Sequence, residues 1–440
     1  MKLWQKEGTQ VAHTVERFTV GRDKEFDLLL AKYDVQGSIA HVTMLGEVGL
    51  LTMEESTAAV SALKEIASDI DNEKFVIEDS IEDVHSQVEF LLTQRIGDTG
   101  KKIHSGRSRN DQVAVDVKLY LRAEILNVKA SVEQFFHLLQ SLSERHKNDL
   151  LPGYTHFQIA MPSSFGLWFG AFAESLVDDL ELLAAAFTVV NKNPLGSGAG
   201  YGSSFPLNRQ RTTELLHFGS LNYNSVYAQM TRGKAEKFTA IGISGIAATL
   251  SKLSMDCCLY LSQNFSFISF PPELTTGSSI MPHKKNPDVF ELIRAKCNRI
   301  QSTPNELTLL LNNLPSGYHR DLQLTKEILF PAIEDLKACL ELAHLMLSNI
   351  QVTKDILKDK KYKYLFSVEE VNRLVNQGLP FREAYQQVGN AIESGGFYFD
   401  QSQPLHHTHE GSLGELSNGK IREEFEKVLK LFGSRSGFKD

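Results

Sequence analysis

The chain has 440 residues, of which 42% are hydrophobic, and its 46 Lys and Arg residues face 54 Asp and Glu residues. This mildly acidic balance disfavours nucleic-acid binding, which usually needs a basic excess, and the length predicts two or three domains with a substantial core. The first residues lack the apolar core of a secretory signal, and four cysteines without a paired spacing argue against a disulfide scaffold, so the sequence predicts a cytoplasmic protein.

The N-terminal region has the patterning of helices. Thr52 and Glu55 have the spacing of a capping box that opens a helix through Ala67. Ser80 and Asp83 have the same spacing, and they accompany an apolar stripe of helical period at Ile81, Val84, Val88, Leu91 and Leu92. Alternating strand patterns are scarce in the chain, so the sequence predicts an all-α fold.

Two long apolar segments lie in the central region. Residues 162–190 are predicted to form one long helix, whose length is typical of a helical bundle. Residues 238–261 are apolar nearly all round but include Gly242, Lys252 and Asp256, and they fall short of a convincing membrane span. A helix without a polar face must be covered on every side. This predicts the centre of a bundle or a subunit interface, and therefore an oligomer.

The segment 277–288, Gly-Ser-Ser-Ile-Met-Pro-His-Lys-Lys-Asn-Pro-Asp, has the composition of an anion-binding loop. Asn286 followed by Pro287 predicts a helix start with the asparagine as N-cap. The N–H groups of that helix terminus and the ammonium groups of Lys284 and Lys285 would attract a carboxylate or a phosphate. For a generic loop of this kind, the alternative is a surface loop that only caps a helix.

Three further segments combine hydroxyl, amide and charged residues: His-Ser-Gly-Arg-Ser-Arg-Asn-Asp-Gln at 104–112, Gly-Tyr-Thr-His-Phe-Gln at 153–158, and Pro-Ser-Gly-Tyr-His-Arg-Asp-Leu-Gln at 315–323 with Lys326 after it. Together with 277–288 they resemble the argininosuccinate lyase subfamily of the fumarase/aspartase superfamily, and the resemblance extends from about Asp27 to about Gly389. The resemblance implies an all-α, three-domain fold with a long central helical bundle. It also implies the cleavage of argininosuccinate to L-arginine and fumarate in arginine biosynthesis.

The same resemblance implies a homotetramer whose central helices form a shared bundle and whose active sites are assembled from several subunits. The expected regions are an N-terminal helical domain at 1–102, a central long-helix domain at 103–350 and a C-terminal helical domain at 351–440. Proton transfer and charge stabilisation suffice for the reaction, so we predict no cofactor. The expected partner is the small molecule argininosuccinate, with no nucleic acid and no membrane.

The reaction requires a base, a stabiliser of negative charge and a proton donor. The resemblance assigns the base to Ser278, whose alkoxide would need stabilisation by loop closure, N–H donors and Lys284. Lys284 and Asn286 suit a carboxylate that gains charge in the transition state. His156 would protonate the departing guanidine, directly or through water, and Glu291 would orient it. Without the surrounding motifs, these last two would be a packed histidine and a helix-face acid.

Nine residues are predicted to bind the substrate. Arg109 and Arg320 can hold carboxylates in bidentate fashion, and the amide side chains can contact either charge. Ser279 is expected to hold the loop or contact substrate, and an exchange of roles with Ser278 stays open. For the arginines, the alternative is a surface ion-pair cluster of little energetic value. The nine residues are Ser108, Arg109, Asn110, Thr155, Ser279, Tyr318, Arg320, Gln323 and Lys326.

The chain departs from the subfamily pattern at several points. Residues 159–162 lack the arginine and glutamine expected to flank the alanine, and residues 231–234 differ from Ser-x-Arg-Asp, so contacts of Arg232 and Lys234 with substrate are left open. His283 stands where argininosuccinate lyases more often have glutamine. A histidine at this position resembles the pattern of adenylosuccinate lyase. That activity, or another fumarate-releasing lyase, is therefore an alternative, and a crystallin-like structural protein of this family is the alternative outside catalysis.

A compact tract of His406, His407 and His409 would offer imidazole ligands to a metal ion. No cysteine or carboxylate spacing of a metal site accompanies it, so we predict no metal. The cysteines lie in apolar or helically patterned surroundings, and they are predicted to be buried small hydrophobes, not activated thiols.

Overall fold

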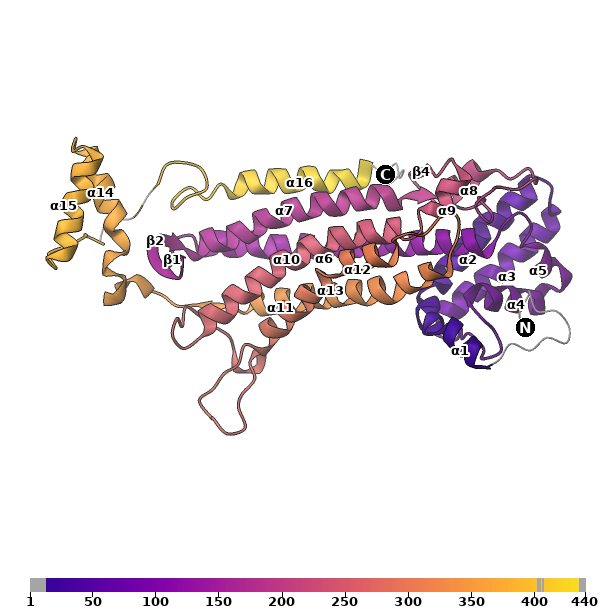
Figure 1. Ribbon diagram of the computed structural model, residues 1–440, viewed down its shortest axis with the longest axis horizontal. Coiled ribbons are helices and arrows are strands. Elements are labelled where there is room, and N and C mark those ends of the chain that lie inside the picture. Colours follow the sequence, from indigo (N-terminus) through magenta and orange to yellow (C-terminus); the bar gives the residue numbers. More distant parts are fainter. Residues whose placement is uncertain (1–12, 402–404, 406, 435–440) are drawn as a thin grey trace.

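The structure is a computed structural model that describes residues 13–401, 405 and 407–434. It is predominantly helical (Figure 1), which confirms the all-α fold class. The α-helices are α1 His13–Val20, α2 Asp23–Glu47, α3 Met53–Asp71, α4 Val84–Ile96, α5 Asp98–Lys102, α6 Arg109–Arg145, α7 Phe165–Val190, α8 Arg209–Leu215, α9 Ser225–Met230, α10 Lys234–Leu261, α11 Asp288–Ile300, α12 Thr303–Leu310, α13 Leu324–Ser348, α14 Ser367–Asn376, α15 Phe381–Glu393 and α16 Asn418–Ser434. The 3₁₀ helices are η1 Pro272–Leu274, η2 Arg320–Gln323, η3 Ile356–Lys358 and η4 Lys360–Phe366.

Short strands pair in the loops between these helices. β1 (Leu150–Thr155) and β2 (Gln158–Ser164) form an antiparallel hairpin. β3 (Lys192–Asn193) pairs in parallel with β4 (Ser220–Leu221), and β5 (Ile268–Ser269) pairs antiparallel with β6 (Gln351–Val352). These pairs fix loops and do not form a larger sheet in the described part of the chain.

The helices lie in three groups along the longest axis of the molecule (Figure 1). Helices α1–α5 gather at one end, α6, α7, α10 and α13 run lengthwise through the middle, and α14 and α15 lie at the opposite end. α6 has 37 residues and is therefore about 55 Å long. Residues at its two ends consequently belong to different parts of the molecule.

The N-terminal helices have a hydrophobic core of their own. Thr52 caps α3 in the predicted capping box, because its Oγ1 accepts from the Glu55 N–H at 3.1 Å and Glu55 Oε2 accepts from the Thr52 N–H at 3.0 Å. The second predicted cap is wrong: α4 is capped by Asp83, and Ser80 lies in a turn ahead of it. The core residues that close this unit include Leu45, Leu63, Val84, Val88 and Leu92.

α7 begins at Phe165, three residues later than predicted. Residues 158–164 form β2, in which Pro162 lies opposite Pro152 of β1. The hairpin ends where Ser164 turns its hydroxyl to the Leu167 N–H at 3.0 Å and caps α7. The pairing with β1 therefore overrides the helical pattern of these residues.

One face of α10 is buried and the other is open. Gly242 approaches α7 closely, since a Cβ at this position would lie 3.1 Å from the Leu183 Cα. Phe238 and Met255 are 37% and 39% exposed. In the described part of the chain, α10 is the helix whose length and composition would allow it to cross a membrane, but 56% of its apolar window is buried, as in the core helices of water-soluble proteins. The sequence predicted that α10 is covered on every side. Within a single chain, only one side of the helix is covered.

The C-terminal region divides into a helix pair of its own and a helix that packs on the central bundle. α14 and α15 pack on each other through Val371, Ala384, Val388 and Phe397. α16 returns to the central helices, where Phe425 stacks on Phe136 with ring centroids 3.7 Å apart. The division into domains at 102 and 350 stays a prediction.

Replacing Gly166 with alanine is expected to destabilise the packing of α7 against the end of α6. A Cβ here would lie 2.6 Å from both the Lys147 Cα and the Ser143 carbonyl oxygen, and backbone atoms cannot move aside as a side-chain end can. We expect a loss of about 1–3 kcal/mol in the free energy of unfolding. A lower thermal midpoint by circular dichroism would show it.

Gly389 in α15 is the matched control, because a Cβ there meets no atom within 4 Å. Gly389→Ala should leave the midpoint unchanged or raise it, since alanine is the better helix former by up to about 1 kcal/mol. Equal midpoints for Gly166→Ala and the wild-type protein would contradict this account of the α6–α7 contact.

Candidate active site

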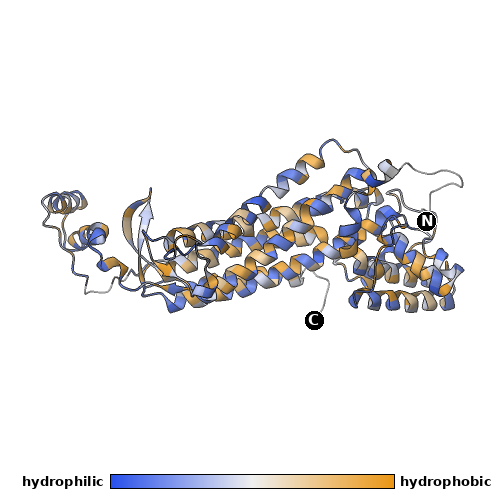
Figure 2. Cartoon of the chain, turned by 90° about the horizontal axis from the view of Figure 1, so that it is seen from below, coloured by the Kyte–Doolittle hydropathy of each residue, from blue (hydrophilic) through white to orange (hydrophobic). Residues whose placement is uncertain are grey.

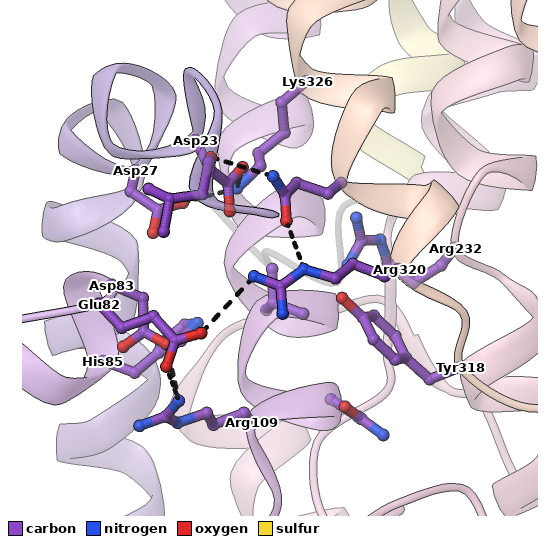
Figure 3. Close-up of a pocket in the computed structure, with 14 residues that line it drawn as sticks. Asp23, Asp27, Glu82, Asp83, His85, Arg109, Arg232, Tyr318, Arg320 and Lys326 are labelled. Atoms are coloured by element: carbon purple, nitrogen blue, oxygen red, sulfur yellow. Dashed lines mark hydrogen bonds and ion pairs between the residues drawn. The ribbon is translucent and has the colours of Figure 1, made fainter. Parts of the chain in front are cut away.

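A cavity of about 260 Å³ lies where the N-terminal helices meet the start of α6, η2 and α13 (Figure 3). It collects six of the residues predicted to bind substrate: Arg109, Asn110, Tyr318, Arg320, Gln323 and Lys326. Eight further residues line it: Val20, Asp23, Asp27, Glu82, Asp83, His85, Val113 and Arg232. The cavity thus combines many cationic and anionic side chains in a small volume.

The start of α6 is held by a capping box that positions Arg109 and Asn110. Ser108 Oγ accepts from the Asn110 N–H at 3.2 Å, and the Ser108 N–H donates to Asp111 Oδ1 at 2.7 Å. The other oxygen of Asp111 accepts from the N–H groups of Gly196 and Gly198, both at 2.9 Å. Ser108 therefore serves as the helix cap and does not line the cavity. Burial raises the pKa of Asp111 to about 6.

The residues of η2 are fixed by the end of α1. Gln323 Nε2 donates to the carbonyl oxygens of Thr19 and Val20, each at 3.1 Å. Arg320 Nη2 donates to the Thr19 carbonyl oxygen at 3.0 Å, and Arg320 Nε donates to Gln323 Oε1 at 3.3 Å. α1 therefore covers one side of the cavity and orients two side chains that were predicted to bind substrate.

Two acidic residues contact two of the three arginines of the cavity. Arg109 Nη1 lies 3.1 Å from Asp83 Oδ2 and 3.5 Å from Glu82 Oε2. The other oxygen of Glu82 lies 3.5 Å from Arg320 Nη2, so Glu82 contacts both guanidinium groups (Figure 3). Asp83 is also the N-cap of α4, which fixes the carboxylate in place.

The remaining cations are paired as well. Lys326 Nζ lies 2.6 Å from an oxygen of Asp23 and 2.6 Å from one of Asp27, and Arg232 Nε donates to Glu236 Oε1 at 3.0 Å. Burial raises the pKa of Asp23 to about 6, although Lys326 opposes that shift. Because each cation of the cavity already contacts a carboxylate, a bound substrate must exchange its own charges with these pairs.

Sequence reasoning missed the acidic residues and His85, and it left Arg232 open. The structure places Arg232 in the cavity wall, whereas Lys234 Nζ lies over the Tyr227 ring, 5.3 Å from its centroid, outside the lining. The run Glu-Asp-x-His at 82–85 was a usable signal, because adjacent acids before a histidine exceed what a helix cap needs. It was interpreted as a cap alone.

His156 and Thr155 lie away from this cavity, at the exposed tip of the β1–β2 hairpin. His156 and Phe157 have φ angles of 53° and 57°, as in a type I′ turn. The hairpin follows the C-terminal end of α6, whereas Arg109 begins that helix, and α6 is about 55 Å long. A single chain therefore does not bring His156 to the cavity, and it leaves the ring exposed, not packed.

The loop 277–287 also projects from the bundle, ahead of α11 (Figure 1). Ser278 Oγ accepts from the N–H groups of Met281 at 3.2 Å and Ile280 at 3.4 Å. Ser279 and Lys284 are exposed, and so is Glu291 on α11. These residues share one loop and helix start, but within the chain they do not reach the cavity.

The predicted N-cap at Asn286 is wrong. α11 begins at Asp288, its N-cap position is Pro287, and no side chain caps it. Asn286 pairs with Thr276 across the base of the loop, and its Nδ2 donates to the Gly277 carbonyl oxygen at 3.3 Å. Because of this pairing, the Asn286 side chain points toward the loop and connects its two ends.

The histidine tract does not gather metal ligands in the described part of the chain. His406 lies outside the described residues, and His407 contacts Ser412 Oγ at 2.6 Å and Glu369 Oε1 at 3.3 Å. The described group whose ligand atoms lie close enough to hold an ion is instead Asp34, His85 and Asp116. Cys257, Cys297 and Cys339 are buried, as predicted, and Cys258 is partly exposed.

The chain is similar in sequence and in fold to known lyases. A sequence profile of a family described as Lyase matches residues 12–302. A protein named argininosuccinate lyase from Bacteroides fragilis is 59% identical, over 98% of this chain and 96% of its own, and another from Thermotoga neapolitana is 38% identical, over 88% and 97%. Among solved structures, an EDDS lyase in complex with formate has a TM-score of 0.76 at 22% identity, covering 97% of this chain and 91% of that one. A class II fumarase from Schistosoma mansoni has a TM-score of 0.71 at 18% identity, covering 92% and 90%.

Proposed function

The chain belongs to the argininosuccinate lyase family within the fumarase/aspartase superfamily, and from this membership we propose that it cleaves argininosuccinate reversibly to L-arginine and fumarate in arginine biosynthesis. The observation that carries the proposal is the charge of the cavity. Argininosuccinate has three carboxylates, an ammonium and a guanidinium, and the cavity offers three arginines, a lysine and four carboxylates. Arginine forks suit carboxylates and the acidic side chains suit the cationic groups.

The loop residues supply the elimination chemistry in this proposal. Ser278 removes the proton from the carbon next to a carboxylate, and Lys284 and Asn286 hold that carboxylate while it gains the charge of the carbanion. The N–H groups that already point at Ser278 Oγ support this role, because they would stabilise its alkoxide. The bond between carbon and guanidine nitrogen then breaks, and its electron pair leaves with the nitrogen.

We assign the proton for the departing guanidine to His156, with Glu291 as the residue that orients it. Imidazole is the side chain best suited to exchange protons at neutral pH. The exposed position of His156 at the hairpin tip supports a site that includes another chain, since an exposed ring is free to reach a second molecule. Thr155 and Ser279 are proposed substrate contacts from these same two segments.

We further propose a homotetramer in which each active site combines segments of different chains. The cavity, the hairpin tip and the loop before α11 lie apart in one chain, and all three contain residues the reaction needs. Hydrophobic residues are spread along the long central helices (Figure 2). Several hydrophobic residues of α7, α10, α11 and α12 are exposed, namely Leu182, Phe238, Met255, Leu292 and Leu309. Covering this surface would bury apolar area and bring the segments together.

The proposal includes a cytoplasmic location and no cofactor. The composition predicts the location, and acid–base chemistry with charge stabilisation accounts for the elimination without a metal or an organic cofactor. We also propose three domains with boundaries near residues 102 and 350, with α16 belonging to the central bundle on which it packs.

Purified protein offered argininosuccinate should release fumarate, followed by its ultraviolet absorbance. Adenylosuccinate, tested separately, should give none, although His283 motivates the test. Release only from adenylosuccinate would overturn the substrate assignment. A folded protein, helical by circular dichroism, that releases fumarate from neither compound would favour a crystallin-like structural role.

A further inference from the structure

His85 lies in the wall of the cavity, and its Nδ1 faces two buried carboxylates. It belongs to the first turn of α4, and its Nδ1 is 2.7 Å from Asp34 Oδ1 of α2 and 3.5 Å from Asp116 Oδ2 of α6. Exposed fractions are 8% for His85, 2% for Asp34 and 1% for Asp116. Three helices therefore converge on one imidazole ring, which lines the substrate cavity. Figure 3 shows His85 among the residues of the cavity wall.

The two carboxylates lack other donors. Asp34 Oδ2 and both oxygens of Asp116 have no hydrogen-bond partner within the described part of the chain. A buried carboxylate without a compensating charge or donor is very costly. A protonated His85 supplies both to Asp34, whereas burial and the neighbouring Asp34 raise the pKa of Asp116 well above its ordinary value. The arrangement therefore favours an imidazolium that chiefly balances the charge of Asp34.

The charges around the ring lead to the same conclusion. Burial opposes the proton of His85, and so does the nearby His104, while Asp34, Asp116 and Asp83 favour it. The carboxylates outweigh burial and raise the pKa of His85 to about 9. The ring therefore keeps its charge throughout the neutral range.

A divalent metal ion is the other cation that this group of ligands could take. Two ligand atoms on one zinc ion, each about 2.0–2.1 Å from it in a tetrahedron, lie about 3.3 Å apart. The separation of 2.7 Å between His85 Nδ1 and Asp34 Oδ1 is instead that of a charge-assisted hydrogen bond. The geometry therefore favours a proton between these atoms over a metal.

The second ring nitrogen of His85, Nε2, is available to a ligand in the cavity. An imidazolium carries an N–H on both nitrogens, and Nδ1 is committed to the carboxylates. His85 Nε2 has no hydrogen bond to another described residue, and the ring lines the cavity. A donor with full positive charge at this place calls for an anionic acceptor, and the anionic groups of argininosuccinate are its carboxylates.

We propose that His85 is a binding residue that stays protonated throughout the neutral range and donates from Nε2 to a substrate carboxylate, and that Asp34 and Asp116 are positioning residues that hold the ring. The inference rests on the proposed function, since it takes argininosuccinate as the ligand. It separates two histidines of the reaction by role, because His156 exchanges its proton while His85 keeps its own.

The test measures KM and kcat for argininosuccinate across pH in wild-type protein and in Asp34→Asn. A raised pKa means that the charged form is present below the pKa and is lost as pH rises through it. Wild-type KM should therefore stay flat until about pH 9. In Asp34→Asn the pKa of His85 falls toward the ordinary value of about 6.5, so KM should approach the wild-type value near pH 6 and rise about tenfold or more by pH 8.

His85→Gln should raise KM about tenfold or more at every pH, with a smaller effect on kcat and without the new pH dependence. Asp98→Asn is the matched control, because its carboxylate is exposed, pairs only with Lys101 among described residues and does not line the cavity. Recovery of Asp34→Asn at low pH would itself show that the variant folds. If Asp34→Asn does not fold, the KM of His85→Gln is the deciding measurement.

A pH profile of folded Asp34→Asn that follows the wild type would overturn the proposal, and so would an unchanged KM in His85→Gln. Wild-type activity is recorded in the same assay. Absence of fumarate release from the wild-type protein would mean that the proposed function fails, which is a different outcome from a failure of the role of His85.

Discussion

Ser278→Ala is expected to abolish fumarate release while the protein folds and assembles as before. The side chain removed is the proposed base, and loss of a positioned base costs about 10²–10⁴-fold in kcat. Its Oγ accepts only N–H groups of its own loop among the described residues, so its loss should not disturb the bundle. Initial rates with argininosuccinate, alongside the elution volume in gel filtration, would measure both effects.

Ser279→Ala is the matched control for this prediction. It removes the neighbouring hydroxyl from the same exposed loop, and it should lower kcat far less than Ser278→Ala. The opposite order would exchange the roles of the two serines. Full activity in Ser278→Ala would remove the base assignment altogether.

Two inactive variants are expected to restore activity when their chains are mixed. Arg109→Ala damages the cavity and Ser278→Ala damages the loop, and the two lie apart in one chain. If each site takes these residues from different chains, random assembly of equal amounts leaves about a quarter of the sites with both residues intact. Co-expression with separate affinity tags and an assay of the doubly tagged protein would measure the recovered rate.

The control mixes Arg109→Ala with Lys326→Ala. Both residues line the cavity of the same chain, so each site receives at least one of the two losses and no recovery is expected. Recovery in this control, or none in the first mixture, would contradict active sites shared between subunits.

The sequence was sufficient for the helices whose ends are local events. The capping box at Thr52 lies within three residues and formed as predicted. The start of α7 and the cap at Asn286 were wrong for one shared reason. In both places a strand partner, β1 for residues 158–164 and Thr276 for Asn286, competes for the backbone. Such partners are not visible in the spacing of the residues themselves.

The candidate site shows the same limit. Residues within the motifs, such as Arg109 and Lys326, were found because a resemblance covers contiguous segments. Asp23, Glu82 and His85 were missed because their importance comes from what folding places beside them. In the sequence, Asp34 and Asp116 look like ordinary helix residues. Their role becomes visible only in the structure, where α2, α4 and α6 bring both carboxylates to the ring of His85.

The length of α6 has a consequence for how this chain can change over evolution. One end of the helix positions Arg109 at the cavity and the other leads into the hairpin that presents His156, without a break between Arg109 and Arg145. Inserting or deleting one residue would rotate one end against the other by about 100° and shift it by about 1.5 Å. Substitutions can accumulate along this helix, but we expect changes in chain length to be confined to the connections outside it. A single insertion would misalign the cavity against the hairpin, and in the proposed tetramer it would disturb two active sites at once.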